Sequence, residues 1–274
     1  MSKVYDDDYY TNRIFLDSVL PVLKPVAEGK ESLRKAWQGK SGICQISCMT
    51  PGEVRDDGSS IEKDGTHFVI EDGEWTVKRG ICESWPKVEL VFKSRKHLNN
   101  FFKGKQFPLP SMKGVFGGGG LFLLFMKALL AMGGLLASKE PPADDEDARL
   151  LVKCMFYLLS TGISTLNKLE HPKVHPWVAA SPDRVYAWAV GDDEELAAYI
   201  RIKAGKSKAS RGVYRRSMPF FTMRFDSVPS ALGILLGTDD MIESTVSGKL
   251  AMEGGPEYGA QLGDHMMLIG DLIQ

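Results

Sequence analysis

The amino-acid sequence predicts an α+β protein made of two lobes of similar design. Three observations support this: a strand-turn-strand pattern that recurs, a strand that leads directly into a helix in both halves, and an acidic, proline-rich segment between the halves. The 274 residues are enough for two ordinary domains of roughly 100 to 150 residues each. We expect lobe one at residues 1–138, a linker at 139–147 and lobe two at 148–274.

The recurring hairpin lies at residues 67–80 (HFVIEDGEWTVKRG) and 199–212 (YIRIKAGKSKASRG). An offset of 132 residues places Gly73 on Gly205. The same offset places Ile70 on Ile202 and Gly80 on Gly212, which predicts a strand, a glycine turn and a second strand in both copies. We interpret the hairpins as copies of one duplicated unit. The alternative is a chance match between two halves that each contain a hairpin.

A strand followed by a helix recurs at residues 86–104 and 219–237, with an offset of 133. Alternate residues of each strand are apolar, so each strand presents one apolar face to a core. These strand residues are Val88, Leu90, Phe92, Phe221, Met223 and Phe225. The helices that follow carry apolar residues at i, i+3 and i+4, which predicts a stripe packed against the sheet. These helix residues are Leu98, Phe101, Phe102, Ala231, Ile234 and Leu235.

The segment SKEPPADDEDAR, residues 138–149, separates an apolar stretch from LLVKCMFYLLSTGISTLNKL. Its prolines predict a linker. Its acidic residues predict the first turn of the next helix, because negative charges interact favourably with a helix N-terminus.

Composition and charge exclude one class of partner. The chain is 43% hydrophobic and 25% charged, with a net charge of −1, so no overall electrostatic attraction to DNA or RNA is expected. The N-terminal sequence MSKVYDDDYY is acidic and polar, whereas a secretory signal begins with basic residues and an apolar run. We expect a cytoplasmic protein that does not bind nucleic acid.

Sequence motifs for catalysis or metal binding are missing. The chain has no G-x-S-x-G, no H-E-x-x-H and no C-x-x-C. Cys44 and Cys48 fall on the same face of an alternating strand, which suits small buried side chains. The sequence therefore predicts no catalytic residue, no metal and no cofactor.

The second half carries a more specific pattern. A strand, a serine before a short helix, and a glycine precede the run Ser247, Gly248, Lys249, Leu250 and Gly254, and an amphipathic helix follows. This order resembles the sterol carrier protein 2 (SCP2-like) family, most specifically over residues 219–273. A weaker resemblance covers residues 42–136, so the chain resembles two tandem members of that family.

The resemblance implies that each lobe is a mixed, roughly five-stranded sheet covered by helices. It also implies a non-enzymatic carrier that binds a fatty acid, a sterol or another lipid in an apolar tunnel between the sheet and the C-terminal helix. Methionines suit such a tunnel because their flexible side chains adapt to ligands of several shapes. The expected ligand-binding residues are Val88, Leu90, Phe92, Phe101, Phe221, Met223, Phe225, Ile234, Leu235, Met252, Tyr258, Leu262 and Met266.

Residues 114–136 (GVFGGGGLFLLFMKALLAMGGLL) are the end helix of lobe one under the repeat. Because nearly every position is apolar, this helix must be buried all round, dock on the other lobe or touch lipid. Lys127 disfavours a membrane span, since a lysine at mid-membrane costs about 2.5 to 3.5 kcal/mol. We expect burial between the lobes, with transient membrane contact through residues 114–136 as the alternative.

The sequence is also compatible with two other functions. One is a scaffold or regulatory subunit with filled cores, and the other is an enzyme acting on a lipid or acyl-CoA with His97 or His265 as its base. We expect His265 to form an exposed pair with Asp264 on the last helix. The basic residues within 201–216 could attract a carboxylate, a phosphate headgroup or an acidic partner, or form a solvated hairpin edge. The sequence does not indicate an oligomeric state.

Overall fold

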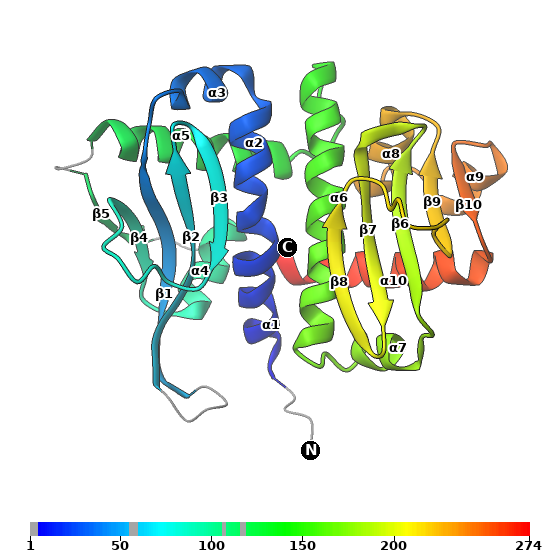
Figure 1. Cartoon of the computed structure of the whole chain (residues 1–274), viewed down its shortest axis with the longest axis horizontal. Coiled ribbons are helices and arrows are strands. Elements are labelled where there is room, and N and C mark those ends of the chain that lie inside the picture. Colours follow the sequence, from blue (N-terminus) through cyan, green and yellow to red (C-terminus); the bar gives the residue numbers. More distant parts are fainter. Residues whose placement is uncertain (1–4, 55–59, 106–107, 116–118) are drawn as a thin grey trace. The chain divides into compact units, whose positions relative to one another are not determined.

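The computed structural model describes residues 5–54, 60–105, 108–115 and 119–274 (Figure 1). It contains two five-stranded mixed sheets with helices packed on them, so the predicted α+β class with two lobes is confirmed. Contacts within the chain define a first lobe, Asp6–Met132, and a second lobe, Gly133–Leu272, with Ile273–Gln274 grouped with the first. The predicted linker limits, 139–147, stay a prediction. Residues 116–118 of the predicted end helix lie outside the described residues.

The first sheet has the strand order β3-β2-β1-β4-β5. Neighbouring strands are antiparallel except β1 and β4, which run parallel. The sheet therefore has a hairpin at one edge and a pair of strands distant in sequence near its centre. Its strands are β1 (Gly42–Val54), β2 (Ser60–Glu71), β3 (Glu74–Arg79), β4 (Val88–Phe92) and β5 (Ser111–Lys113).

Helices of the first lobe precede β1, lie between β4 and β5, and follow β5. Asp6 caps α1 by accepting a hydrogen bond from the Tyr9 N–H at 2.8 Å. The rings of Trp37 and Trp75 meet edge to face at 4.7 Å and join the helical segment to the sheet. The helical elements are α1 (Asp7–Ile14), the π-helical turn η1 (Phe15–Val19), the short turn η2 (Leu20–Val22), α2 (Leu23–Gly29), α3 (Glu31–Trp37), α4 (Arg95–Phe102) and α5 (Gly119–Leu136).

The second sheet has the order β10-β9-β6-β7-β8, and its only parallel pair among the described strands is β6 with β9. Its strands are β6 (Arg184–Val190), β7 (Asp193–Lys203), β8 (Lys206–Arg211), β9 (Phe221–Phe225) and β10 (Leu250–Glu253).

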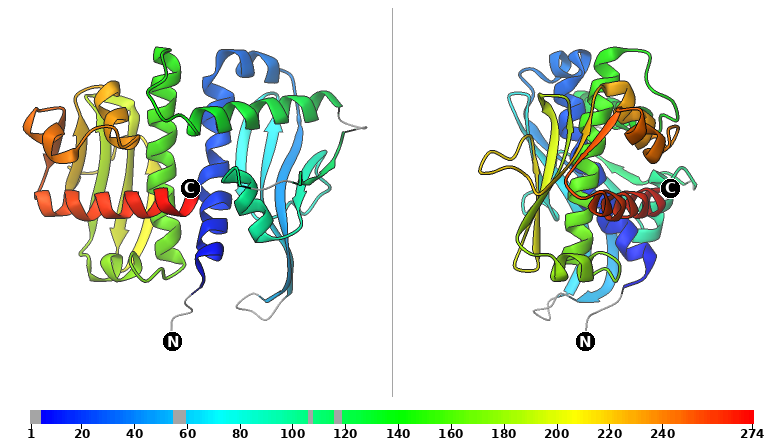
Figure 2. Two further views of the ribbon diagram at one scale, coloured as in Figure 1. Left: turned by 180° about the vertical axis from the view of Figure 1, so that it is seen from behind. Right: turned by 90° about the vertical axis from the view of Figure 1, so that its right-hand side faces the viewer.

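Helices of the second lobe include the longest one described, α6 (Asp145–Lys168), which packs on β7 and β8. Asp144 caps α6 and the first turn is acidic, as the sequence predicts. Figure 2 shows α6 and the C-terminal helix on the same side of the second sheet. The remaining helices are α7 (His175–Ala180), α8 (Val228–Leu235), α9 (Met241–Val246) and α10 (Pro256–Ile273).

Both lobes use the same strand order and directions when β1–β5 are matched with β6–β10. The predicted hairpins are confirmed: β2–β3 turns at Gly73 with φ 88°, and β7–β8 turns at Gly205 with φ 71°, values that favour glycine. Ser94 and Ser227 cap α4 and α8 through their hydroxyl oxygens, as expected for the strand-serine-helix pattern. Duplication as the origin of this likeness stays an interpretation.

Helix α5 is the end helix of the first lobe, but it is not buried on all sides. Only 28% of it is buried, against 83% of the apolar part of α6; both helices are long and apolar enough to cross a membrane by length and composition. Burial of α5 between the lobes stays a prediction. A helix that lies on one sheet buries only the stripe of residues that faces the sheet. The other positions of α5 are apolar as well, so apolar side chains remain exposed.

The predicted exposed pair on α10 is also wrong in part. His265 is 7% exposed, and its ring lies 4.6 Å from the ring of Trp177. The reason is helical spacing, since His265 lies three residues after Leu262 and four before Ile269, and both of these are fully buried. Asp264 alone stays exposed.

Candidate functional site

The predicted ligand-binding residues lie in the two cores. The first-lobe set gathers around Phe92, whose ring is 5.2 Å from that of Phe101. In the second lobe, Phe156 of α6 stacks on Phe225 at 6.0 Å. Eight predicted side chains are buried, namely Val88, Leu90, Phe92, Phe221, Met223, Phe225, Leu262 and Met266. Five are half-buried, namely Phe101, Ile234, Leu235, Met252 and Tyr258.

Close contacts join α10 to the second sheet. A Cβ atom added at Gly259 would lie 2.6 Å from the Met252 sulfur and 3.2 Å from the Phe221 ring. Further along the helix, the Trp188 Nε1–H donates to the Met266 sulfur at 3.3 Å. At Gly259 two side chains predicted to wall a tunnel, Met252 and Phe221, lie against the helix, and glycine permits this close approach.

Helix α5 meets the first sheet through one stripe and leaves another open. Phe125 packs on Phe68 and Trp75, with ring centroids 5.8 Å and 6.4 Å away. On the other side, Leu123 and Leu130 are 68% and 72% exposed. An apolar face of this kind on a long helix is the first candidate contact surface of the molecule.

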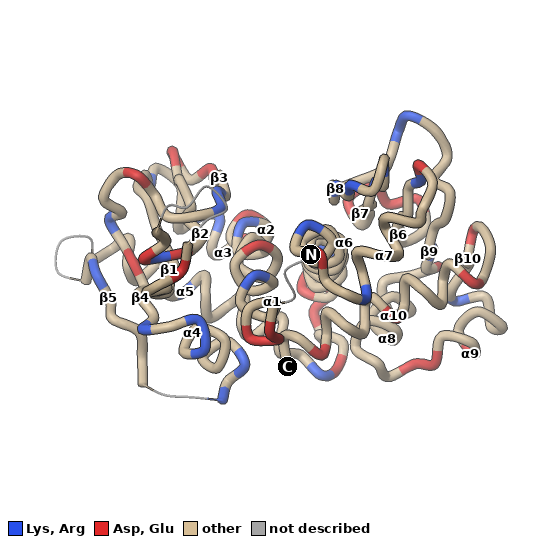
Figure 3. Tube along the Cα trace, turned by 90° about the horizontal axis from the view of Figure 1, so that it is seen from below, with Lys and Arg blue, Asp and Glu red and all other residues tan. Residues whose placement is uncertain are grey.

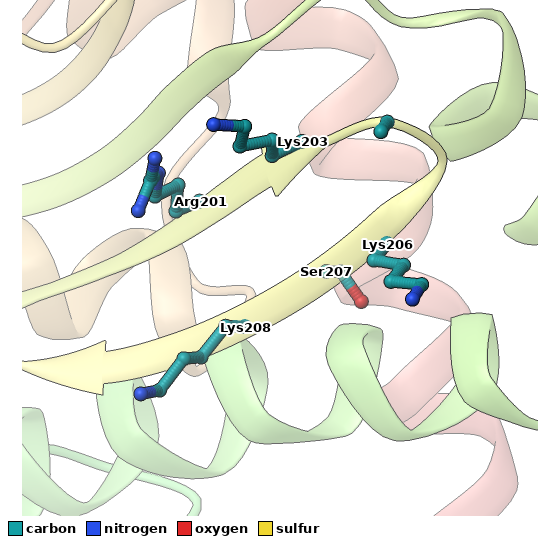
Figure 4. Close-up of a pocket in the computed structure, with 6 residues that line it drawn as sticks. Arg201, Lys203, Lys206, Ser207 and Lys208 are labelled. Carbon is teal, nitrogen blue, oxygen red and sulfur yellow. The ribbon is translucent and has the colours of Figure 1, made fainter.

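A second candidate surface lies on the β7–β8 hairpin. A depression of about 360 Å³ is lined by Arg201 and Lys203 of β7, Ala204 of the turn, and Lys206, Ser207 and Lys208 of β8 (Figure 4). The Ser207 hydroxyl faces α6, where it accepts a hydrogen bond from the Asn167 side chain at 2.9 Å. This bond anchors the hairpin to the core and leaves its cationic side chains at the surface.

A third polar cluster surrounds Glu89 on β4, on the strand face opposite to Val88 and Leu90. Its carboxylate is 3% exposed and accepts hydrogen bonds from the side chains of Gln45 at 2.6 Å, Ser47 at 2.8 Å and Lys63. Lys113 lies 3.3 Å from the other oxygen. Burial alone would raise the pKa of Glu89, but these hydrogen bonds outweigh burial and hold the pKa below its ordinary value.

The cluster joins β1, β2, β4 and β5 rather than offering a reactive group. A carboxylate whose pKa is lowered and whose oxygens are all engaged is a poor base. Sequence reasoning missed this cluster. The available signal was the alternation in GICQISC, which places Gln45 and Ser47 on the face opposite to Cys44 and Cys48.

Two buried thiols and one of the predicted bases offer little reactivity. Burial raises the pKa of Cys44 and of Cys154 to about 12 each, so both thiols are protonated at neutral pH. The His97 ring is fixed at both ends, because the Lys93 N–H donates to Nδ1 at 3.2 Å and Nε2 donates to the Pro108 carbonyl at 2.8 Å. With Nδ1 already an acceptor, His97 has no free lone pair for a substrate proton.

His265, the other predicted base, lies in an apolar environment. Burial lowers its pKa, with an opposing effect from Asp264, and Nε2 has no hydrogen-bond partner among the described residues. Within the same described residues, no group of three or more His, Cys, Asp or Glu side chains is arranged to hold a metal ion.

Comparisons with known proteins find only weak similarity to this chain. No protein-family model matches the sequence, and no curated protein matches it. One similar solved structure is a conserved hypothetical protein of Thermus thermophilus, described as a possible sterol carrier protein. It is 18% identical with a TM-score of 0.27, over 39% of this chain and 79% of that one.

Another similar structure is the stereoselective inverting sec-alkylsulfatase Pisa1 of a Pseudomonas species, at 15% identity and a TM-score of 0.24. The likeness covers 52% of this chain but only 27% of the sulfatase chain. With TM-scores this low, neither likeness decides what this chain does.

Proposed function

We propose that the chain is a non-enzymatic lipid-binding or carrier protein of the cytoplasm, with a fatty-acyl or sterol-like ligand. The open apolar face of α5 carries the proposal. Leu123 and Leu130 lie on a helix whose one charged residue is Lys127, and both leucines face water in the structure. Covering apolar surface contributes roughly 25 cal/mol per Å², so an acyl chain on this face would be held by a favourable contact.

In this proposal the end helices α5 and α10 are the covers of their sheets. Most of the predicted wall residues are buried, so a ligand reaches them when a cover moves away from its sheet. Met252 lies on β10 under α10, and Met266 lies on α10 itself. The flexible side chains of both methionines can adapt to a ligand. Contact of α5 with a membrane during loading belongs to the same proposal.

Lipid binding is tested on the purified full chain. Solvent extraction and native mass spectrometry are expected to find a co-purified lipid, and a fluorescent fatty acid is expected to bind. In the variant L123S/L130S, affinity for the fatty acid should fall about tenfold or more, because each lost leucine removes roughly 1 kcal/mol of apolar contact.

The matched control is I242S/V246S on α9, which replaces two aliphatic side chains that are 74% and 85% exposed in the other lobe. It should bind the fatty acid as the unchanged protein does. Repeated extractions without lipid, together with no fluorescence change, would contradict the proposal.

A second candidate function is favoured by the contacts of Gly259 with Met252 and Phe221. If the cores are filled throughout, the chain would be an interaction protein whose α5 face binds another protein. Extraction would then yield no lipid, and the α5 variant would bind a fatty acid no worse than the control.

A further inference from the structure

The β7–β8 hairpin gathers four cations on two adjacent strands. In the ladder Arg201 lies directly opposite Lys208, and Lys203 lies directly opposite Lys206. Directly opposed side chains have Cβ atoms about 4.5 to 5.5 Å apart, and like charges in this position repel. Two consecutive pairs of like charge therefore concentrate positive potential around the depression.

No carboxylate among the described residues forms an ion pair with these cations. The carboxylates at the start of β7 already have partners: Glu194 pairs with Arg215, and Glu195 pairs with Lys153. Asp183 lies near the turn, where its carboxylate accepts the Ala204 N–H at 3.0 Å. It is one negative charge beside four positive ones.

The loop after β8 extends this surface. Tyr214 packs on Tyr199 with ring centroids 5.1 Å apart, so the loop returns over the strand that carries Arg201. Figure 3 shows Lys and Arg at β8 and along this loop. The loop continues to Met218, which is 90% exposed. Cations next to an exposed apolar side chain are typical of a protein surface that contacts an anionic membrane.

The fold itself does not require these cations. In the matching hairpin of the first lobe, Val69 and Thr76 take the places of Arg201 and Lys208, and the pair Glu71 with Glu74 takes the place of Lys203 with Lys206. The same turn geometry therefore forms with acidic residues. The four-cation arrangement needs a reason other than the stability of a β-hairpin.

We propose that the β7–β8 hairpin binds the phosphate headgroups of an anionic phospholipid surface. Figure 4 shows the cationic ends spread along the two strands rather than converging on one point, which suits several headgroups better than one small anion. The inference rests on the proposed lipid-binding function. It adds the β7–β8 hairpin to α5 as a second surface that contacts the membrane.

The test uses the full chain with vesicles of phosphatidylcholine, alone or mixed with phosphatidylserine, in a sedimentation assay. Binding is expected only to the mixed vesicles, and it should weaken as salt rises. In K203Q/K206Q, partitioning onto mixed vesicles should fall roughly 30-fold, as expected from about 1 kcal/mol for each cation near an anionic surface. The control K139Q/K173Q removes two exposed lysines outside the hairpin and should lose much less.

Three results would overturn the inference: no binding to mixed vesicles, equal losses in the two variants, or saturable binding of inorganic phosphate with no vesicle binding. Salt-dependent self-association lost in K203Q/K206Q would instead assign the hairpin to a contact between copies of this chain. L123S/L130S separates the two proposals, because it should lose fatty-acid binding and keep its dependence on phosphatidylserine.

Discussion

Glu89 carries a buried negative charge that is held by two lysines and two neutral donors. Replacing it with glutamine leaves Lys63, which is 21% exposed, beside an uncharged amide. E89Q is therefore expected to lower the free energy of unfolding by about 2 kcal/mol at neutral pH. Urea unfolding followed by tryptophan fluorescence, to which the buried Trp37 and Trp75 of the same lobe contribute, measures the loss.

The matched variant K113Q removes the more exposed partner and should cost less than about 1 kcal/mol. An equal loss in E89Q and K113Q would contradict the view that Glu89 is the centre of the cluster.

The same carboxylate gives a pH dependence. Because the folded-state pKa of Glu89 is lowered, its stabilisation is complete above the ordinary glutamate value of about 4.3 and is lost as pH falls through the lower folded value. The difference in stability between the unchanged protein and E89Q should therefore shrink when unfolding is measured at about pH 3 instead of pH 7. A constant difference would show that Glu89 does not stabilise the fold through its charge.

At the scale of residues, sequence patterns located the inward faces but not every burial. Alternation correctly placed Val88, Leu90 and Phe92 inside. It could not show that Glu89, on the opposite face, is covered, because that depends on the parallel pairing of β1 with β4. His265 was misplaced because it was paired with the exposed Asp264, although its spacing from Leu262 and Ile269 places it on the buried stripe of the helix.

The two hairpin turns differ in what surrounds their glycines. A Cβ atom added at Gly73 would lie 2.8 Å from the Trp37 carbonyl oxygen, whereas at Gly205 the nearest atom is 3.9 Å away. Both positions have positive φ, so G205A should cost about 1 kcal/mol and G73A about 2 kcal/mol or more. Urea unfolding of the two variants makes the comparison, and equal costs would contradict it.

Phe221 on β9 distinguishes a filled core from a tunnel wall. It is fully buried and close to Gly259 of α10. In a filled core F221A should cost about 3 to 5 kcal/mol, whereas in a tunnel it should cost clearly less because no new cavity forms. The neighbouring variant F220A is the control, since Phe220 is 37% exposed and its loss should be the same in both cases. Thermal unfolding with and without fatty acid provides the measurement.

At the scale of elements, the hairpins, the serine-capped helices and the end helices could be predicted because each depends on local spacing. The open face of α5 could not. A helix that is apolar all round gives no periodicity from which to choose the stripe that packs on a sheet. The four cations of β7–β8 were visible as a run in the sequence, but their opposition across the ladder follows from register.

The whole molecule consists of two sheets of identical order joined through an exposed connection. Residues 137–144 link α5 to α6, and Lys139 within them is exposed. Brief trypsin digestion is expected to cut after Lys139 among the first sites, giving fragments 1–139 and 140–274 that mass spectrometry identifies. K139Q should lose this cut and keep the others. Persistence of the intact connection in the unchanged protein would contradict the predicted linker.

The strand order of each sheet also sets the timing of folding. The parallel pairs begin at Cys44 with Val88 and at Tyr186 with Phe221, partners that are roughly 35 to 45 residues apart, whereas each edge hairpin closes within a few residues. Hairpins of this kind form in roughly 1 to 10 μs, and distant parallel pairing is slower. On the ribosome, β1 must therefore wait with one side uncovered until β4 has emerged, and the nascent chain is most open to misassembly during that interval.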